Sequence, residues 1–331
     1  MMVKFGVEFV PYEPFWRTAF YAIQAEKRGF EYIWVTDHYN NRNVYVTLTT
    51  IALHTSRIKL GIGVTNPYLV NPVVTAQAAA SISEIAPDRV ILGIGPGDKT
   101  TLASLGVDMV LPVAAVKECV LIARSLFEKG KVEFEGKVFK VPSAAFYFKV
   151  KGRIPIFIGA QGPQMLRIAA KYGDGVLINA SHPKDIKEAM KHVKKGVKAA
   201  GKSMEDIEIV AYTSLSIDEN LEKALKAASR VVAFIVAGSP DFILERHGID
   251  VDEAKEIKKA LADARWKDAF SMVNQKMIDA FSITGTPEMC IKKIEELAKI
   301  GVTQIVAGSP IGPNVRKSID LISEKVIAAF K

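Results

Sequence analysis

Two acidic residues, Glu8 and Asp98, stand at or just after the ends of segments that have the pattern of buried strands. In Val3–Val10, bulky apolar residues alternate with a second set that includes Glu8. Side chains alternate between the two faces of a strand, so the apolar set suits packing against helices and Glu8 is expected on the inner face. A carboxylate there is costly unless it has a partner or a chemical task. We predict acid–base chemistry for both acids; the structural alternatives are a salt bridge for Glu8 and an N-cap of the turn Thr100–Leu105 for Asp98.

Glycine pairs end two further strand-like segments. Gly61 and Gly63 share one face of their strand, as do Gly93 and Gly95 of the next strand. If that face points inward, these strand ends have no side chains there and a flat ring can lie against the backbone. We therefore predict a hollow at this place; the alternative is that the glycines only permit tight turns.

A third glycine-rich stretch, Gly159-Ala160-Gln161-Gly162, leads from a strand pattern into a helix that begins at Pro163. A turn of this kind presents backbone N–H groups to an anion. The segment Gly173–Gly175 and Asn179 follow, and we expect them to complete a phosphate-binding site.

The order of the elements predicts how these strand ends are brought together. Eight strand patterns are each followed by a helical pattern, which implies a parallel sheet covered by helices. The expected strands are Val3–Val10, Tyr32–Thr36, Ile58–Gly63, Arg89–Gly95, Ile154–Gly159, Gly175–Ile178, Ile207–Ser216 and Val302–Gly308. Eight such units in 331 residues match a closed (β/α)8 barrel, an α/β TIM barrel whose active site lies at the carboxyl ends of the strands. A doubly wound open sheet is the alternative.

Two insertions interrupt this pattern within what we predict to be a single barrel domain, residues 1–331. Lys131–Val141 alternates around Gly136 and predicts a hairpin before strand five. Leu221–Lys276 is too long for one crossover and predicts extra helices after strand seven. Within it, the apolar tract Ala227–Val236 is either core or a subunit interface.

The composition excludes several classes of protein. Hydrophobic residues make up 49% of the chain and charged residues 24%, as in a globular protein with a large core. The formal charge of +8 suggests an anionic partner, but the lysines are spread among acidic residues and no nucleic-acid-binding motif is present. The two cysteines, and an N-terminus without a signal-peptide pattern, predict a cytoplasmic protein. No apolar stretch is long enough to cross a membrane, and no Cys/His cluster has metal-ligand spacing.

With these motifs, the chain resembles the bacterial-luciferase-like superfamily and, within it, the family of coenzyme F420-dependent methylenetetrahydromethanopterin reductases of methanogenic archaea. The segments that carry the resemblance are Lys4–Pro11, Val35–His38, Leu60–Pro67, Leu92–Asp98, Ile158–Gly162 and Thr284–Pro287. The resemblance implies an oxidoreductase that transfers a hydride between reduced F420, a deazaflavin, and methylenetetrahydromethanopterin. The alternatives are another F420- or FMN-dependent enzyme of the superfamily and a non-catalytic coenzyme-binding barrel.

The resemblance also assigns residues to the coenzyme. The deazaflavin ring is implied to lie against a bulge with a non-prolyl cis peptide between Gly63 and Val64, at the strand ends that include Gly95. The residues implied to flank the ring or its ribityl chain are Asp37, His38, Thr65 and Asn66. The residues implied to hold the phosphate and lactyl part are Gly159, Ala160, Gln161, Gly162, Gly175, Val176 and Asn179. Basic residues at the rim are implied to meet the polyglutamate tail.

The implied chemistry needs a general acid near the pterin ring. A carboxylate in an apolar barrel has its pKa raised toward the neutral range that this task requires. We predict that Glu8 is the donor and that Asp98 positions or shares its proton. In related deazaflavin dehydrogenases a tryptophan follows the histidine of the Asp-His pair, whereas Asn40–Asn43 follows His38 here. This difference argues against alcohol oxidation and leaves the role of His38 open. The expected assembly is a homo-oligomer, either a dimer or a tetramer.

Overall fold

The structure is a computed structural model that describes residues 3–331. These residues form two compact units. The N-terminal unit comprises residues 6–179 and 188–210, and the C-terminal unit comprises residues 3–5, 180–187 and 211–331. The prediction of one domain over residues 1–331 stays a prediction.

The N-terminal unit contains six parallel strands that neighbour one another in the order β1-β2-β3-β4-β7-β8. They are β1 (Lys4–Phe9), β2 (Tyr32–Val35), β3 (Lys59–Thr65), β4 (Val90–Ile94), β7 (Ile156–Gly159) and β8 (Gly175–Ile178). The helices between and after them are α1 (Phe15–Lys27), α2 (Val44–His54), α3 (Pro72–Ile85), α4 (Lys99–Ser104), α5 (Pro112–Lys129), α6 (Pro163–Tyr172) and α7 (Pro183–Ala199).

The C-terminal unit contains three strands in the order β10-β9-β11. They are β9 (Glu208–Ile217), β10 (Ser282–Gly285) and β11 (Gln304–Ile311). Its helices are α8 (Leu221–Gly238), α9 (Asp241–Arg246), α10 (Val251–Ala262), α11 (Trp266–Ser271), α12 (Gln275–Phe281), α13 (Pro287–Ile300) and α14 (Val315–Leu321), followed by a π-helical turn over Ile322–Ile327.

The strands β1, β2, β3, β4, β7, β8, β9 and β11 are the strands of a (β/α)8 barrel, so the predicted fold class is confirmed. Two elements differ from the expectation. Strand β3 was predicted to end at Gly63 but continues to Thr65, because pairing with β4 resumes after a register shift between Ile62 and Thr65. The short strand β10 was not predicted, since its four residues directly follow α12 and precede a proline.

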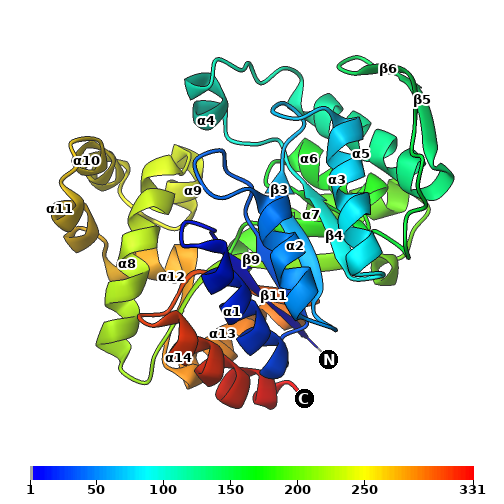
Figure 1. Cartoon of the computed structure of the whole chain (residues 1–331). Coiled ribbons are helices and arrows are strands. Elements are labelled where there is room, and N and C mark those ends of the chain that lie inside the picture. The colour runs from blue at the N-terminus through cyan, green and yellow to red at the C-terminus, as the bar shows by residue number, and fades with distance from the viewer. Residues whose placement is uncertain (1–2) are drawn as a thin grey trace. The chain divides into compact units, whose positions relative to one another are not determined.

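The predicted hairpin is present as β5 (Lys131–Glu135) and β6 (Lys140–Ala145), an antiparallel pair that extends from α5 (Figure 1). Its turn is held by one buried carboxylate, that of Glu118 on α5. Glu118 accepts hydrogen bonds from the backbone N–H groups of Lys137, Val138 and Phe139 at 2.7, 2.9 and 2.9 Å. Burial acts to raise the pKa of Glu118, but these three donors together outweigh it and lower the pKa below its ordinary value.

Replacing Glu118 by Gln is expected to lower the free energy of unfolding by about 1–3 kcal/mol at pH 7, because buried N–H donors lose a charged acceptor. The folded pKa is the lower one, so this stabilisation is present above the unfolded pKa of about 4.3 and is lost as the pH falls through the folded pKa. The difference in stability between the two proteins in urea denaturation should therefore be largest at pH 7 and should shrink as the pH falls below the unfolded pKa.

Glu135→Gln is the matched control for this experiment. It lies on the same hairpin and pairs with Lys140 at 2.8 Å, but both side chains are exposed. A surface pair of this kind contributes about 0–1 kcal/mol. Equal losses in the two variants would contradict the assignment to Glu118.

The glycines of the inner strand face make room for aromatic side chains, which corrects the prediction of a hollow. A Cβ atom added to Gly61 would lie 2.2 Å from the ring of the fully buried Trp34, and one added to Gly175 would lie 2.6 Å from the ring of Phe157. The Trp34 and Phe157 rings contact each other with centroids 5.6 Å apart. Trp34 comes from β2, which adjoins β3, and Phe157 comes from β7, which adjoins β8. Their rings fill the interior space that the glycine pattern alone leaves empty.

The extra helices after β9 have a hydrophobic core of their own, built by α8 to α12. Five residues of the tract Ala227–Val236 are buried, namely Ala227, Ala228, Val232, Ala233 and Val236, the last four within this core. Of the two roles predicted for this tract, core is therefore the one that the structure supports.

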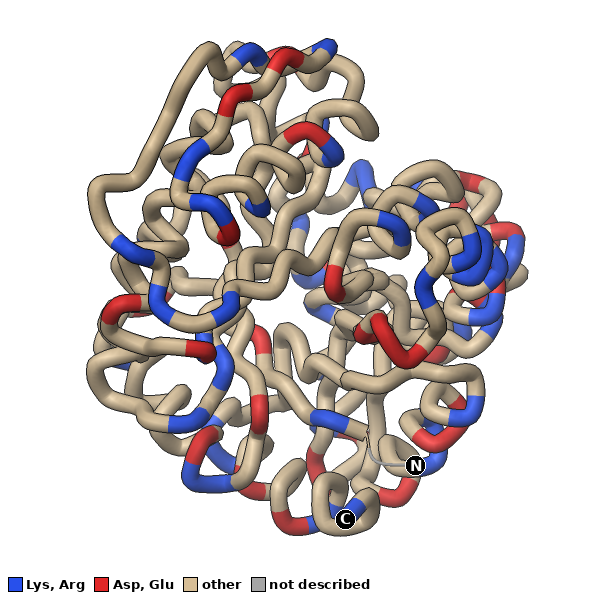
Figure 2. Tube along the Cα trace, turned by 90° about the vertical axis from the view of Figure 1, so that its right-hand side faces the viewer, with Lys and Arg blue, Asp and Glu red and all other residues tan. Residues whose placement is uncertain are grey.

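Positive charge does not gather in one place along the chain. Figure 2 shows lysine and arginine positions interspersed with aspartate and glutamate positions, as the sequence predicts for solvated helix faces. Among residues 3–331, no helix has both the length and the apolarity that a membrane span requires.

Candidate functional site

The predicted site residues all belong to the N-terminal unit, and most of them lie at carboxyl ends of its strands. Glu8 is the next-to-last residue of β1 and is partly buried. In the strand register it lies opposite Trp34, which lies opposite Gly61. Residues in register on parallel strands project from the same face, so Glu8 shares the inner face with Trp34, as its alternation in β1 predicts.

Asp98 has a structural role in addition to any chemical one. It is exposed, and its side chain caps α4 by accepting a hydrogen bond from the backbone N–H of Thr101 at 2.7 Å. The capping alternative considered for this residue is therefore confirmed. Asp98 is exposed, whereas Glu8 is partly buried on the inner strand face, so of the two acids Glu8 is better placed to meet a substrate.

The predicted cis peptide between Gly63 and Val64 is present, within the bulge of β3. The partly buried Val64 side chain lies among three glycines of the adjoining strands. Cβ atoms added to Gly95 and Gly159 would lie 2.7 and 3.5 Å from its methyl groups, and one added to Gly93 would lie 3.1 Å away. The missing side chains of Gly93, Gly95 and Gly159 thus leave the space that Val64 occupies. The surface at these strand ends is therefore formed by the Val64 side chain and not by backbone alone.

Asp37 and His38 follow β2 and differ in their surroundings. His38 is exposed, whereas Asp37 is partly buried beside the Thr65 hydroxyl at the end of β3. Burial raises the pKa of Asp37, and the Thr65 hydroxyl and His38 oppose this only in part. A buried acid with a raised pKa at a strand end is a group that can carry a proton.

Asn66 is buried and is used by the turn that follows β3. Its Oδ1 atom accepts hydrogen bonds from the N–H groups of Tyr68 and Leu69 at 3.1 and 3.2 Å. The Tyr68 hydroxyl in turn donates to the Val110 carbonyl at 2.9 Å. Asn66 therefore fixes the shape of the turn beside the bulge.

The turn Gly159–Gly162 connects β7 to α6 as predicted, but not all of its N–H groups are available. The Ala160 N–H donates to the Leu177 carbonyl at 3.0 Å, so it belongs to the sheet. Gln161 and Gly162 are exposed, and Gly162 immediately precedes Pro163 at the start of α6. The part of this turn that can meet an anion is therefore its end at Gln161 and Gly162, next to the start of α6.

The remaining members of the predicted phosphate site are separated along β8. Gly175 and Val176 begin this strand and are buried, with Gly175 against the ring of Phe157. Asn179 follows the strand and is exposed. Gly175 and Asn179 are four residues apart, about 13 Å of extended chain, so Asn179, but not Gly175, lies at the end of the strand toward which the Gly159–Gly162 turn points.

The structure adds buried hydroxyls that the sequence analysis did not single out. The hydroxyls of Thr36, Tyr45 and Thr75 are buried without a hydrogen-bond partner among the described residues. Tyr45 on α2 lies close to Asp37, to Thr65 and to Thr75 of α3. In the sequence, Tyr45 and Thr75 occupy ordinary positions of helical segments, so no local pattern indicated a role for them.

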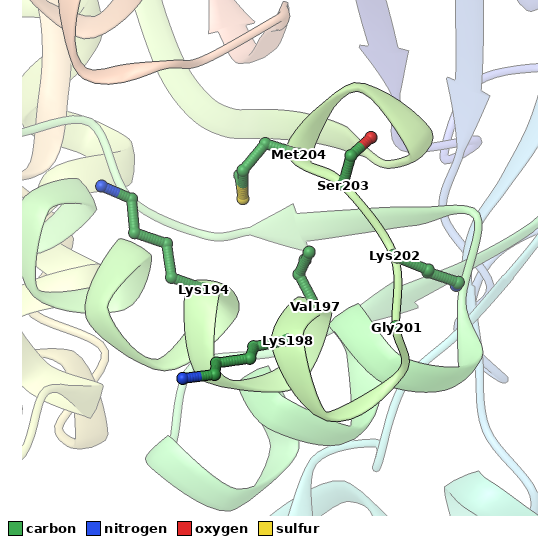
Figure 3. A pocket seen from close by; sticks show the side chains of 7 residues that line it. All are labelled: Lys194, Val197, Lys198, Gly201, Lys202, Ser203 and Met204. Carbon is green, nitrogen blue, oxygen red and sulfur yellow. The ribbon is translucent and has the colours of Figure 1, made fainter.

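A basic cavity of about 410 Å³ lies elsewhere in the same unit (Figure 3). It is lined by Lys194, Val197 and Lys198 of α7 and by Gly201, Lys202, Ser203 and Met204 after it. Lys202 donates to the Gly173 carbonyl at 2.8 Å, just before β8 begins. The cavity is thus at the amino end of the strands, away from the predicted site, so these lysines are not rim residues for a coenzyme tail.

The comparisons with known proteins agree with this arrangement. A family model described as luciferase-like monooxygenase matches residues 3–304, so the chain belongs to that family of barrels. A 5,10-methylenetetrahydromethanopterin reductase of Archaeoglobus fulgidus is 50% identical over 333 residues, which cover 99% of this chain and 100% of the relative. The enzyme of the same name from Methanopyrus kandleri is 44% identical, with 99% of each chain covered. The chain belongs, with these relatives, to the 5,10-methylenetetrahydromethanopterin reductase family.

A solved structure gives the same result. The coenzyme F420-dependent tetrahydromethanopterin reductase from Methanopyrus kandleri superposes with a TM-score of 0.93 at 42% identity, with 100% of both chains covered. An F420-dependent secondary alcohol dehydrogenase, 22% identical, superposes with a TM-score of 0.83 and shows the shared fold.

Proposed function

We propose that the protein is an F420-dependent 5,10-methylenetetrahydromethanopterin reductase, which transfers a hydride between reduced F420 and methylenetetrahydromethanopterin to give methyltetrahydromethanopterin. The observation that carries the proposal is the similarity along the whole chain to enzymes of that name, at 50% and 44% identity. The reaction is a step of methanogenesis and one-carbon metabolism, and the relatives are archaeal.

The strand ends around the β3 bulge fit a flat deazaflavin. A Cβ at Gly95 or Gly159 would contact Val64, so these glycines leave room for the Val64 side chain of the bulge, against which the proposal places the face of the ring. Asp37, His38 and Thr65 border the ring or its ribityl chain in the proposal, while Gln161, Gly162 and Asn179 meet the phosphate side. When bound, reduced F420 supplies the hydride.

The protein's own residues orient the substrate and manage one proton. The partly buried Glu8 protonates the pterin amine as the N–CH2–N bridge opens, which leaves an iminium carbon able to accept the hydride. General acids of this kind contribute about 10²–10⁴-fold to rate. Asp98 holds the start of α4 and positions the proton transfer. The rings of Trp34 and Phe157 fill the barrel interior next to the site and exclude water from that side.

The proposal predicts a coenzyme preference that a binding titration can test. Purified protein is expected to bind F420 and not NADPH, because no glycine-rich dinucleotide motif follows the first strand. Oxidation of reduced F420, followed by its absorbance, should depend on added methylenetetrahydromethanopterin. Tight binding of NADPH without binding of F420 would contradict the coenzyme assignment. Binding of F420 without turnover that depends on methylenetetrahydromethanopterin would contradict the substrate assignment.

The cellular setting is also part of the proposal. We expect a cytoplasmic homo-oligomer, a dimer or tetramer, that does not act on nucleic acid or at a membrane. The support is that both cysteines, Cys119 and Cys290, are buried and unpaired, as in proteins of a reducing compartment. Light scattering of the purified protein tests the oligomeric state.

A further inference from the structure

The segment after α7 folds back over the end of this helix and forms one wall of the cavity in Figure 3. Gly201, with φ +67°, turns the chain so that the Lys202 N–H donates to the Val197 carbonyl at 3.2 Å. The Asp206 carboxylate then accepts from the Ser203 N–H at 2.8 Å and from the Ser203 hydroxyl at 3.0 Å. These local hydrogen bonds fix the shape of the wall, so the cavity does not depend on a ligand to form.

The centre of the cavity is apolar. The buried Val197 of α7 and the partly buried Met204 of the following turn point into it, and the stems of Lys194 and Lys198 border it (Figure 3). Lysine stems commonly cover apolar surface while the ammonium group stays in water. The volume of about 410 Å³ is in the range of small-molecule sites, which are mostly apolar with a few polar groups. A simple inorganic ion would leave most of this space to water, so the lining favours a ligand with an apolar part.

Two of the three lysines that line the cavity have no acidic partner. Lys194 and Lys198 form no ion pair with the side chains of residues 3–331, whereas Lys191 of the same helix pairs with Glu188 at 2.6 Å. Residues four apart lie on the same side of a helix, where like charges repel each other. Figure 3 shows both ammonium groups on one side of the apolar centre. An anionic group bound between them would remove this repulsion and pair with both charges.

The third lysine is already engaged. Lys202 donates to the Gly173 carbonyl at 2.8 Å and lies close to the Asp174 carboxylate. Its nitrogen points away from those of Lys194 and Lys198 (Figure 3). The anionic group of a ligand is therefore expected at the end of the cavity that Lys194 and Lys198 form.

We propose that this cavity binds a small amphipathic phosphate, that is, an apolar chain or ring that carries a phosphate monoester. The apolar part lies between Val197 and Met204, and the phosphate lies between the ammonium groups of Lys194 and Lys198. A phosphate monoester carries about −1.5 to −2 elementary charges at pH 7 and has enough acceptor oxygens for both lysines. The site is at the amino end of the strands, so it is separate from the proposed coenzyme site and does not depend on the proposed function.

Calorimetric titration with octyl phosphate, below the concentration at which it aggregates, tests the proposal. One molecule is expected to bind per chain, with a dissociation constant at least about tenfold lower than that of inorganic phosphate or of 1-octanol. Neither of these two molecules alone can use both the apolar centre and the lysines. The double variant Lys194→Gln/Lys198→Gln should weaken octyl phosphate binding by about tenfold, because it removes both charge-assisted contacts.

A matched control and a direct probe of position make the result specific. Lys191→Gln/Lys195→Gln removes two positive charges from the same helix at exposed positions outside the cavity, so it should bind octyl phosphate as the wild type does. Protein labelled with ¹³C at the methionine methyl groups reports on the apolar centre. The Met204 signal, identified by its loss in Met204→Leu, should shift with octyl phosphate and saturate at the calorimetric dissociation constant.

Four results would overturn the proposal. Octyl phosphate fails to bind, or binds no more tightly than inorganic phosphate, so that the apolar centre plays no part. The two double variants lose the same affinity, so that only the overall charge of the protein matters. The Met204 signal does not shift although binding occurs, so that the ligand lies elsewhere. Addition of F420 displaces octyl phosphate, so that the two compete for one site at the other end of the strands.

Discussion

Turnover of the Glu8→Gln variant is expected to fall about 10²–10⁴-fold, the usual contribution of a general acid, while its affinity for F420 stays nearly unchanged. Glutamine keeps the size and polarity of the side chain but has no proton to give. The partly buried position of Glu8 at the end of β1 is the reason for preferring it over the exposed Asp98. Steady-state rates of reduced F420 oxidation, together with F420 titrations, measure the two quantities.

Two variants control this experiment. Asp98→Asn removes the second acid but keeps a side chain that caps α4 equally well. If Asp98 only positions the proton, this variant should lower turnover less than Glu8→Gln does. Glu31→Gln changes an exposed acid just before β2 and should leave turnover as it is. Near-normal turnover in Glu8→Gln combined with loss in Asp98→Asn would reverse the two roles. If neither variant matters, the proton comes from water or His38.

The second large effect is expected in the barrel interior. Gly61→Ala should destabilise the protein by about 3 kcal/mol, the upper part of the range for overpacking, because its Cβ would lie 2.2 Å from the ring of Trp34. Trp34 is fully buried and packed against Phe157, so it has little room to move. Urea denaturation followed by circular dichroism measures the change.

A double variant and a control test the stated cause. In Gly61→Ala/Trp34→Leu the smaller side chain removes the clash, so the double variant should be more stable than the sum of the single changes predicts. Gly162→Ala adds a Cβ that meets no atom within 4 Å and should cost no more than about 1 kcal/mol. Additive losses in the double variant would show that Gly61 is required for some other reason.

The sequence by itself determined the fold class and the ends of most elements. Prolines stand at the start of α3, α5, α6, α7 and α13, where a proline in the first turn loses no hydrogen bond, so these helix starts can be recognised from the sequence. The alternation in β1 placed Glu8 on the inner face, since side-chain direction in a strand follows from position alone. The family resemblance anticipated the bulge at Gly63–Val64.

Tertiary structure decided what fills the space around those residues. A glycine in the sequence shows that a side chain is absent, but not which neighbour takes its place; Trp34 and Phe157 come from other strands and closed the predicted hollow. Gly175 and Asn179 are near in sequence yet lie at opposite ends of β8, because an extended strand separates its ends. The surroundings of Asp37 come from β3, α2 and α3, so its raised pKa depends on contacts between segments that no local pattern contains.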